Sequence, residues 1–435
     1  MTGVRRRNQL AGNRACRILS VTLMVTVLCS TPGCWGKREL EERSFVTLLG
    51  IDTANDGSIL ATVVIAVPRA LGGGGRMGGG GTSAAAVRAS GSGKNIEEAM
   101  RKIEVLNARE LTTVHLSVLV LGEDFARSDV GPVIDVFSRS LEFRPTTLVA
   151  TCKGRAVDFL KGFEAFEEIE PSLYLSKMIT TSHSSVGGCP LVTMHDFMVG
   201  YNTLSSDSWA PYVGLSSASP AEEVSEEAPK GDGAGAGGDK REAQSAEEPR
   251  KIVQLHGTAV FRKVGPVYKM VGSLDMPESM AALLMRGELP AGFLDVAYPG
   301  DQAETTLALH DTLTSSHVTI DGSTVDAAFR VVATASLSES RVGAQLPETD
   351  QGFRLALTHT AEEELASLLA KTFAKLTSLG SDVLGLGRRV QASFSTYAEW
   401  EAFGWPTHFP SVAASFNVKL HILAGGFTIE KPSPR

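Results

Sequence analysis

The fold is decided by a stretch near the N-terminus with the sequence SFVTLLGI at residues 44–51, NDG at residues 55–57 and SILATVVIAV at residues 58–67. Both apolar runs have the length and the β-branched content that are typical of strands, and Asn-Asp-Gly between them is a strong turn signal. We therefore expect a β-hairpin here.

Helices and strands alternate after this hairpin. Asn95 and Glu98 have the spacing of a helix-capping box, and the apolar residues that follow Asn95 repeat on one helical face. Residues 114–121 and 146–151 predict buried strands, and residues 130–140 between them predict a helix. This alternation indicates an α/β arrangement for the first part of the chain.

The second half of the chain is richer in strand patterns. Its longest helical pattern has Thr360 as the expected N-cap, Glu363 as the capping-box partner and Gly380 as the stop signal. The remaining elements predicted there are strands at residues 253–261, 267–271, 316–320, 327–333, 353–357 and 411–424, and a helix at residues 277–286. Strands grouped before a long helix are typical of an α+β domain.

Length and composition indicate several globular domains. The 435 residues are 43% hydrophobic and 21% charged, and domains usually have about 100 to 200 residues. Two low-complexity stretches interrupt the pattern: a glycine-rich loop at residues 72–93 and an acidic insertion at residues 216–250, which we expect to be disordered. We predict an α+β, mixed α/β fold of three domains with mixed sheets, divided as residues 34–200 (N-terminal α/β), 201–295 (small, middle) and 296–435 (C-terminal α+β). The formal net charge is −8, and without the five arginines of the first 33 residues 36 basic and 49 acidic residues remain, a charge of −13 that disfavours nucleic acid as a partner.

The first 33 residues have the layout of an export signal that is cleaved. Five arginines precede an apolar run at residues 18–28, which is too short to cross a bilayer as a helix, and the segment has no acidic residue. The signal ends at Gly33, and Cys34 follows in the position of the acylated cysteine of bacterial lipoproteins. Cys29 is a poorer candidate because no small residue precedes it. We therefore expect Cys34 to carry lipid and to anchor the protein at a membrane.

A search for catalytic and metal-binding patterns finds none that is complete. The GSGK sequence at residues 91–94 lacks the first glycine and the final Ser or Thr of a phosphate-binding loop. Asp275 with Glu278, or the acidic triplet at residues 362–364, offers paired carboxylates, but a triplet near a helix start is explained by the helix dipole. We therefore predict no catalytic residue, no metal site, no cofactor and no enzyme activity. The histidines are dispersed, for example at His115, His183, His195, His256 and His310.

Two cysteines, Cys152 and Cys189, remain in the chain after the signal and the anchor. They can form one disulfide in an oxidising compartment, or they can be buried as small apolar residues. Sequence leaves both possibilities open.

Several short motifs, taken in order, resemble the Ger(x)C family, the C-subunit lipoproteins of spore germinant receptors. After Cys34 and Trp35 these are LLGID at 48–52, SGKNIEEA at 92–99, LGED at 121–124, FRPTT at 143–147, PSLYL at 171–175, GTAVFR at 257–262, DVLGLG at 382–387, Trp400 through Phe409-Pro410, and residues 418–426. The resemblance implies a three-domain lipoprotein on the outer face of the spore's inner membrane. It also implies integral membrane A and B subunits as partners. Only Cys34 matches a functional residue of the family.

A second class of function is an extracytoplasmic solute-binding lipoprotein, which delivers a small ligand to a transporter. Such a protein needs a deep cleft between two α/β lobes of comparable size. The sequence indicates three unequal parts, so we favour the germination hypothesis.

Overall fold

The computed structural model describes residues 19–26, 42–67, 86–162, 168, 170–217, 251–297, 304–322, 324–340 and 351–423. The chain divides into two compact units, residues 1–43 and residues 44–435. In the first unit, residues 19–26 form a short helix with exposed apolar side chains. Within the described ranges, no helix combines the length and the apolar character needed to span a bilayer. Cys34 and most of the predicted signal lie outside the described residues.

A nine-stranded mixed sheet forms the larger part of the second unit. Its strand order is β3-β2-β1-β5-β6-β7-β8-β9, and β4 also pairs with β1. β1 pairs antiparallel with β2 and parallel with β5, and the strands from β5 to β7 are parallel to one another. The strands are β1 (Arg43–Thr53), β2 (Ile59–Ala66), β3 (Ala86–Gly93), β4 (Glu110–Thr112), β5 (Val118–Gly122), β6 (Leu148–Cys152), β7 (Trp209–Ser217), β8 (Lys251–Val264) and β9 (Val267–Leu274).

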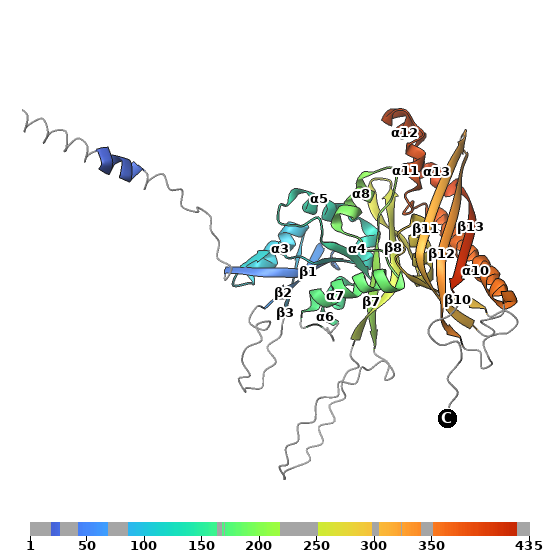
Figure 1. Ribbon diagram of the computed structural model, residues 1–435. Coiled ribbons are helices and arrows are strands. Elements are labelled where there is room, and N and C mark those ends of the chain that lie inside the picture. The colour runs from blue at the N-terminus through green and yellow to red at the C-terminus, as the bar shows by residue number, and fades with distance from the viewer. Residues whose placement is uncertain are drawn as a thin grey trace, which may run out of the picture. The chain divides into compact units, whose positions relative to one another are not determined.

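Helices cover both faces of this sheet, which explains why a central strand such as β5 is a continuous apolar run. Successive side chains of β1 point to opposite faces, so Leu48 and Leu49 belong to different apolar clusters. The two groups of helices lie on opposite sides of β1 (Figure 1). One face packs on α3 (Ile96–Val105), α5 (Gly131–Arg139) and α8 (Met194–Asn202), and the other on α6 (Ala156–Gly162) and α7 (Pro171–Thr181).

The expected hairpin and the helix after it are confirmed. β1 and β2 form the hairpin, with Gly57 in a left-handed conformation in the turn. Asn95 caps α3 by accepting a hydrogen bond from Glu98 N at 2.8 Å. Glu98 in turn accepts from Lys94 N, one residue earlier than the usual capping box predicts.

The glycine-rich stretch ends earlier than the sequence predicts, because its last eight residues form β3. Two of its glycines are needed for close packing against α3. A Cβ at Gly91 would lie 2.7 Å from Ala99 O, and one at Gly93 would lie 2.5 Å from Ala99 N. Glycine here permits a close strand-to-helix contact, which composition alone does not distinguish from a flexible loop. Residues 72–85, and residues 218–250 of the predicted acidic insertion, lie outside the described residues.

A second sheet of four strands has the order β10-β11-β12-β13. One face packs on the long helix α10 (Gln351–Leu379), whose apolar residues contact the inward side chains of β12. On β11 the buried residues Thr305 and Leu307 alternate with more exposed neighbours, as expected for a strand with one buried face. The strands are β10 (Gly292–Ala297), β11 (Glu304–Asp321), β12 (Thr324–Ser340) and β13 (Ala413–Leu423).

The prediction of a strand at residues 353–357 was wrong, since these residues lie in the first two turns of α10. Thr360 does not cap the helix: its hydroxyl donates to Ala356 O at 3.1 Å, as threonines in the middle of a helix do. Short alternating apolar runs fit both a strand and one face of a helix, and the strong capping pattern at Thr360 favoured the wrong boundary. The predicted stop at Gly380 is confirmed by its positive φ of 65°.

The two sheets share one apolar cluster. It runs from the inner face of the large sheet through α9 to α10 and the four-stranded sheet. The boundary predicted between residues 200 and 201 falls within α8, and strands on both sides of it belong to the large sheet. The remaining helical elements are α4 (Glu123–Ser128), the π-helical turn Ser182–Val186, α9 (Met276–Arg286), α11 (Leu386–Gln391), α12 (Tyr397–Phe403), α13 (Trp405–His408) and the 3-10 turn Phe409–Ser411. The mixed α+β class with mixed sheets is confirmed.

Candidate functional site

Asp382 is the centre of a buried junction between α10 and the elements that follow it. Its carboxylate accepts hydrogen bonds from Leu386 N at 3.0 Å, Gly387 N at 2.7 Å and the Trp405 indole at 2.9 Å. The side chain is buried, and burial raises the pKa of Asp382 above its ordinary value while these donors lower it. One carboxylate thus fixes the start of α11 and the position of Trp405. We call these residues the Asp382 junction.

Glycines and an arginine complete the Asp382 junction. A Cβ at Gly387 would lie 2.4 Å from the Trp405 indole nitrogen, so only glycine fits there. Gly385 has a φ of 71° and begins α11. Arg262 on β8 donates to Leu379 O at 3.0 Å and so satisfies a carbonyl at the C-terminus of α10, where a cation is favourable. The end of the GTAVFR motif therefore meets the chain just before the DVLGLG motif.

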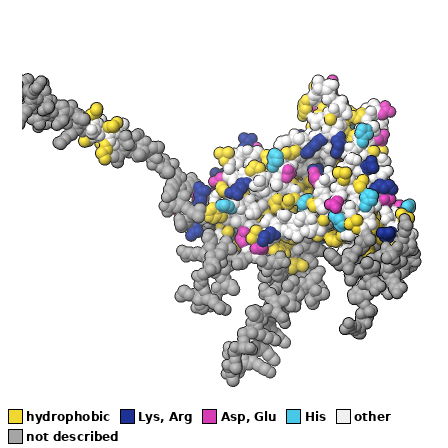
Figure 2. All heavy atoms as spheres, in the orientation of Figure 1, with side chains coloured by type: hydrophobic (Ala, Val, Ile, Leu, Met, Phe, Trp, Pro, Cys, Tyr) yellow, Lys and Arg dark blue, Asp and Glu magenta, His cyan; other side chains and the backbone are white. Residues whose placement is uncertain are grey.

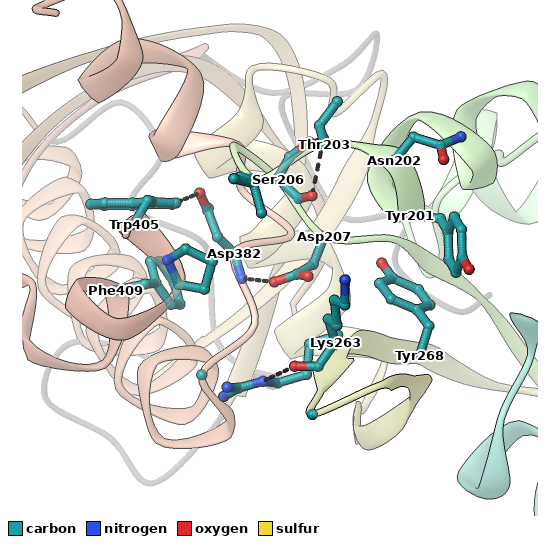
Figure 3. A pocket seen from close by; sticks show the side chains of 15 residues that line it. Tyr201, Asn202, Thr203, Ser206, Asp207, Lys263, Tyr268, Asp382, Trp405 and Phe409 are labelled. Carbon is teal, nitrogen blue, oxygen red and sulfur yellow. Dashed lines mark hydrogen bonds between the residues drawn. The ribbon is translucent and has the colours of Figure 1, made fainter. Parts of the chain in front are cut away.

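Asp207 connects this junction to the large sheet. Its backbone N donates to Asp382 O at 2.9 Å, and its carboxylate accepts from Asp382 N at the same distance. Figure 3 shows the two aspartates side by side on the wall of a cavity of about 220 Å³, with Tyr268 and Lys263 across it. This volume is below the roughly 300 Å³ at which small-molecule sites begin, so the cavity suits a few water molecules.

Asp207 is expected to make stability depend on pH. Burial, with a contribution from the Asp382 carboxylate, raises the pKa of Asp207 from 3.8 to about 7. Between these values the folded protein keeps a proton that the unfolded chain releases, so the free energy of unfolding falls as pH rises. Asp207 should lower the free energy of unfolding by on the order of a few kcal/mol over this pH range, since one pKa unit corresponds to about 1.4 kcal/mol.

The check is the melting temperature at pH 5 and pH 8 for the wild type, Asp207→Asn and the control Asp326→Asn, an exposed position on β12. We expect the wild type and the control to lose stability toward pH 8, and Asp207→Asn to lose clearly less. Equal losses in all three proteins would contradict this assignment.

A second cavity, of about 550 Å³, lies among α8, the end of α9 and α11. Arg286 lies over the Trp209 ring at 4.9 Å and donates twice to Glu288, each time at 2.8 Å. Arg286 also donates to Val383 O, which ties α9 to the Asp382 junction. The volume is in the range of small-molecule sites, and the charged walls favour a polar occupant.

Asp52, the last residue of the LLGID motif, forms a second buried junction. Its carboxylate accepts from Ala156 N at 2.6 Å and Val157 N at 2.8 Å, at the start of α6. Burial raises the pKa of Asp52, and these two donors lower it. A Cβ at Gly122 would lie 2.0 Å from Asp52 Oδ1, which explains the glycine of the LGED motif. Both motifs therefore hold α6 against the ends of β1 and β5.

The acidic residues that the sequence offered as paired carboxylates mostly bind backbone N–H groups or a lysine in the structure, and they do not form a carboxylate pair. Asp275 and Glu278 form a capping box for α9, and Glu278 also contacts Lys375 at 2.5 Å. The acidic triplet lies in the middle of α10, so the helix-dipole interpretation was wrong. Glu362 accepts from Leu420 N at 3.0 Å and Glu364 from Ala297 N at 3.1 Å, which joins α10 to β13 and β10.

Cys152 and Cys189 do not form a disulfide. Cys152 and Cys189 are free and buried in the same apolar cluster. Burial raises the pKa of Cys189 to about 12 and that of Cys152 well above its ordinary value. Within the described ranges, no three His, Cys, Asp or Glu side chains gather as a metal site.

Sequence reasoning missed all three of these carboxylates, Asp52, Asp207 and Asp382, as sites. Asp52 and Asp382 were noted only inside motifs, and Asp207 was not noted at all. The available signal was a single acidic residue next to an apolar run, as in LLGID and DVLGLG. Cys34, the one site residue that sequence reasoning selected, lies outside the described residues.

Comparison with known proteins identifies the class. A family model for "Spore germination protein N-terminal domain" matches residues 36–215, and one for "Spore germination B3/ GerAC like, C-terminal" matches residues 256–426. The two matches follow each other in the order of the family, and both buried junctions lie within them. The chain is thus a spore germination protein of mixed α+β fold. It belongs to the Ger(x)C family.

Curated relatives from Bacillus subtilis (strain 168) agree with this assignment. Spore germination protein KC is 26% identical over 280 residues, which are 64% of this chain and 64% of that protein, slightly less than two thirds of its length. Putative spore germination protein YfkR is 24% identical over 87% of this chain and 90% of its own length. A solved structure described as "Crystal Structure of the GerBC protein" has 17% identity and a TM-score of 0.47, and the match covers 86% of this chain and 96% of that one.

Proposed function

We propose that this protein is a non-catalytic, membrane-anchored lipoprotein subunit of a spore nutrient germinant receptor and is required for germination. The observation that carries the proposal is the match of both family models, in order, behind an N-terminus with the layout of a lipoprotein signal. Acyl chains on Cys34 are the proposed attachment to the outer face of the spore's inner membrane. The proposed partners are the integral membrane A and B subunits of the receptor.

The described residues support a structural role for the family motifs. Hydrogen bonds of three motif residues fix helices on sheets: Asp52, Arg262 and Asp382. Gly122 leaves the room that Asp52 needs. Such residues build a rigid body and need no bound substrate. This fits a subunit that acts through its surfaces within a complex.

The alternative, a solute-binding lipoprotein, would hold its ligand between two similar lobes. The two sheets here are unlike, with nine and four strands in the described part of the chain. The second cavity lies among three helices, so it is not a cleft of that kind. Family membership therefore favours the receptor subunit.

The test is nutrient germination of spores in which this receptor alone responds to the nutrient. We expect deletion of the gene, and the Cys34→Ala variant, to slow the release of dipicolinic acid at least about tenfold, because a protein without acyl chains loses its membrane attachment. Cys29→Ala is the matched control, since it changes the other cysteine near the cleavage site. It should germinate normally.

Growth, and germination by a trigger that bypasses nutrient receptors, should be unchanged in all strains. Normal nutrient germination of both the deletion and the Cys34→Ala strain would contradict the proposal. If Cys29→Ala lost nutrient germination and Cys34→Ala germinated normally, Cys29 and not Cys34 would be the acylated residue.

A further inference from the structure

The edge of the large sheet at which β1 begins exposes large apolar side chains. Leu141 is fully exposed, Val105 is 86% exposed and Leu106 is 77% exposed. Single exposed apolar side chains are ordinary, but several that gather at one place mark a surface that contacts another body. Apolar and basic side chains occur together at this end of the body in Figure 2.

The topology places these three residues at one edge. β1, β5 and β6 are parallel neighbours, so the segments that enter β5 and β6 lie at the edge where β1 starts. Leu141 lies in the segment that enters β6. A Cβ at Gly93 would meet Ala99, whereas one at the earlier Gly91 would meet Ile103. α3 therefore runs antiparallel to β3, and the C-terminal end of α3 returns to the edge where β1 starts.

A hydrogen bond confirms that the two segments meet. Thr113 N, in the segment that enters β5, donates to Glu142 Oε2 at 3.4 Å. Glu142 is the residue after Leu141, and Thr113 directly follows β4, which pairs with β1. The segments that carry the exposed apolar residues therefore lie at the same end of the sheet as the start of β1.

Three arginines accompany the apolar residues. Arg101 lies one helical turn before Val105, Arg109 follows α3, and Arg144 follows Leu141. All three are exposed, and none forms an ion pair with a residue in the described ranges. We call Arg101, Val105, Leu106, Arg109, Leu141 and Arg144 the basic apolar edge. Glu104, Glu110 and Glu142 lie beside these residues in the sequence, so this edge is distinguished by three exposed arginines without an ion pair in the described ranges, not by its net charge.

The chain that leads to this edge is short. Nine residues, 35–43, separate Cys34 from Ser44. A segment of that length spans about 35 Å when fully extended and roughly 17 Å on average when flexible. Lipid on Cys34 would therefore hold the start of β1 close to a bilayer, whatever path the segment takes.

We propose that the basic apolar edge docks on the surface of an anionic lipid bilayer, with the leucines and the valine at the acyl boundary and the arginines on lipid phosphates. This inference rests on the proposed lipid anchor. Exposed apolar residues flanked by arginines are the combination that interfacial binding requires. Docking would orient the whole body on the membrane, with β1 at the bilayer side.

The test places an environment-sensitive fluorophore on Leu106→Cys in the full acylated protein. The buried thiols of Cys152 and Cys189 have raised pKa values, so they react slowly with the label. The matched control is Leu313→Cys, an equally exposed leucine on β11 at 70% exposure. The proteins are reconstituted into phosphatidylcholine vesicles with and without phosphatidylglycerol.

We expect a blue shift at Leu106→Cys on vesicles with phosphatidylglycerol and none at Leu313→Cys. Changing Arg101, Arg109 and Arg144 together to Glu should lower the docked-to-free ratio about a hundredfold, at roughly fivefold per arginine. Arg330→Glu, at an exposed position on β12, is the control and should change nothing.

The outcomes separate this inference from the proposed function. If the protein is acylated and stays on the vesicles but Leu106→Cys behaves like Leu313→Cys, the docking edge is wrong and the anchor stands. A blue shift that the three Arg→Glu changes leave intact would also overturn the anionic-lipid inference. If the protein carries no lipid and leaves the vesicles, the anchor itself fails.

Discussion

Replacing Asp382 with alanine is expected to lower the free energy of unfolding by about 3–5 kcal/mol, because it leaves buried N–H groups without acceptors. The groups are those of Leu386, Gly387 and the Trp405 indole. The change also removes the hydrogen-bonded anchor between the end of α10 and the start of α11. Urea denaturation followed by tryptophan fluorescence measures the effect.

The matched control for Asp382→Ala is Asp326→Ala, an exposed aspartate on β12, which should change stability by less than about 0.5 kcal/mol. The loss of stability for Asp382→Asn should lie between the losses for these two variants. An amide keeps one acceptor oxygen, but its NH₂ group faces N–H groups that are themselves donors. A loss for Asp382→Ala as small as the control's would show that the junction is not a stabilising centre.

Asp52→Ala is expected to produce the second largest loss, about 2–4 kcal/mol. The carboxylate is the N-terminal cap of α6 and is buried, so its removal leaves Ala156 N and Val157 N without acceptors. The same denaturation experiment measures the loss.

The two junctions lie in different parts of the fold and share no residue. The double variant Asp52→Ala, Asp382→Ala should therefore lose the sum of the single losses to within about 0.5 kcal/mol. A loss well below the sum would show that the two junctions are coupled, which the contacts do not predict.

Local signals in the sequence predicted many of the elements. The hairpin of β1 and β2 follows from Asn55-Asp56-Gly57, and α3 follows from Asn95 and its apolar spacing. The apolar run of β5 marks a strand buried on both faces. These signals lie within a few residues of one another, which is why one unaligned chain displays them.

The parts that the sequence did not predict depend on contacts between distant residues. The N-terminal turns of α10 are stabilised by packing on the four-stranded sheet, and no local signal separates them from a strand. Asp207 and Asp382 are 175 residues apart and meet only in the folded protein. Gly91 and Gly93 resemble a flexible loop until α3 is placed on them.

The family motifs illustrate both cases. Sequence shows their order but gives no reason for their residue types. In the structure, Gly122 leaves room for Asp52, and Gly387 leaves room for the Trp405 indole. The motifs are therefore mainly requirements of packing and hydrogen bonding, which is why they gave no catalytic pattern.

The most direct test of the account is the intact mass of the protein from detergent-solubilised membranes of sporulating cells, compared with Cys34→Ala and Cys29→Ala. We predict that the wild type and Cys29→Ala begin at Cys34, carry acyl chains and copurify with two integral membrane subunits. Cys34→Ala should carry no lipid and should leave the membrane fraction. An unacylated wild-type chain without membrane companions would contradict both the anchor and the receptor complex.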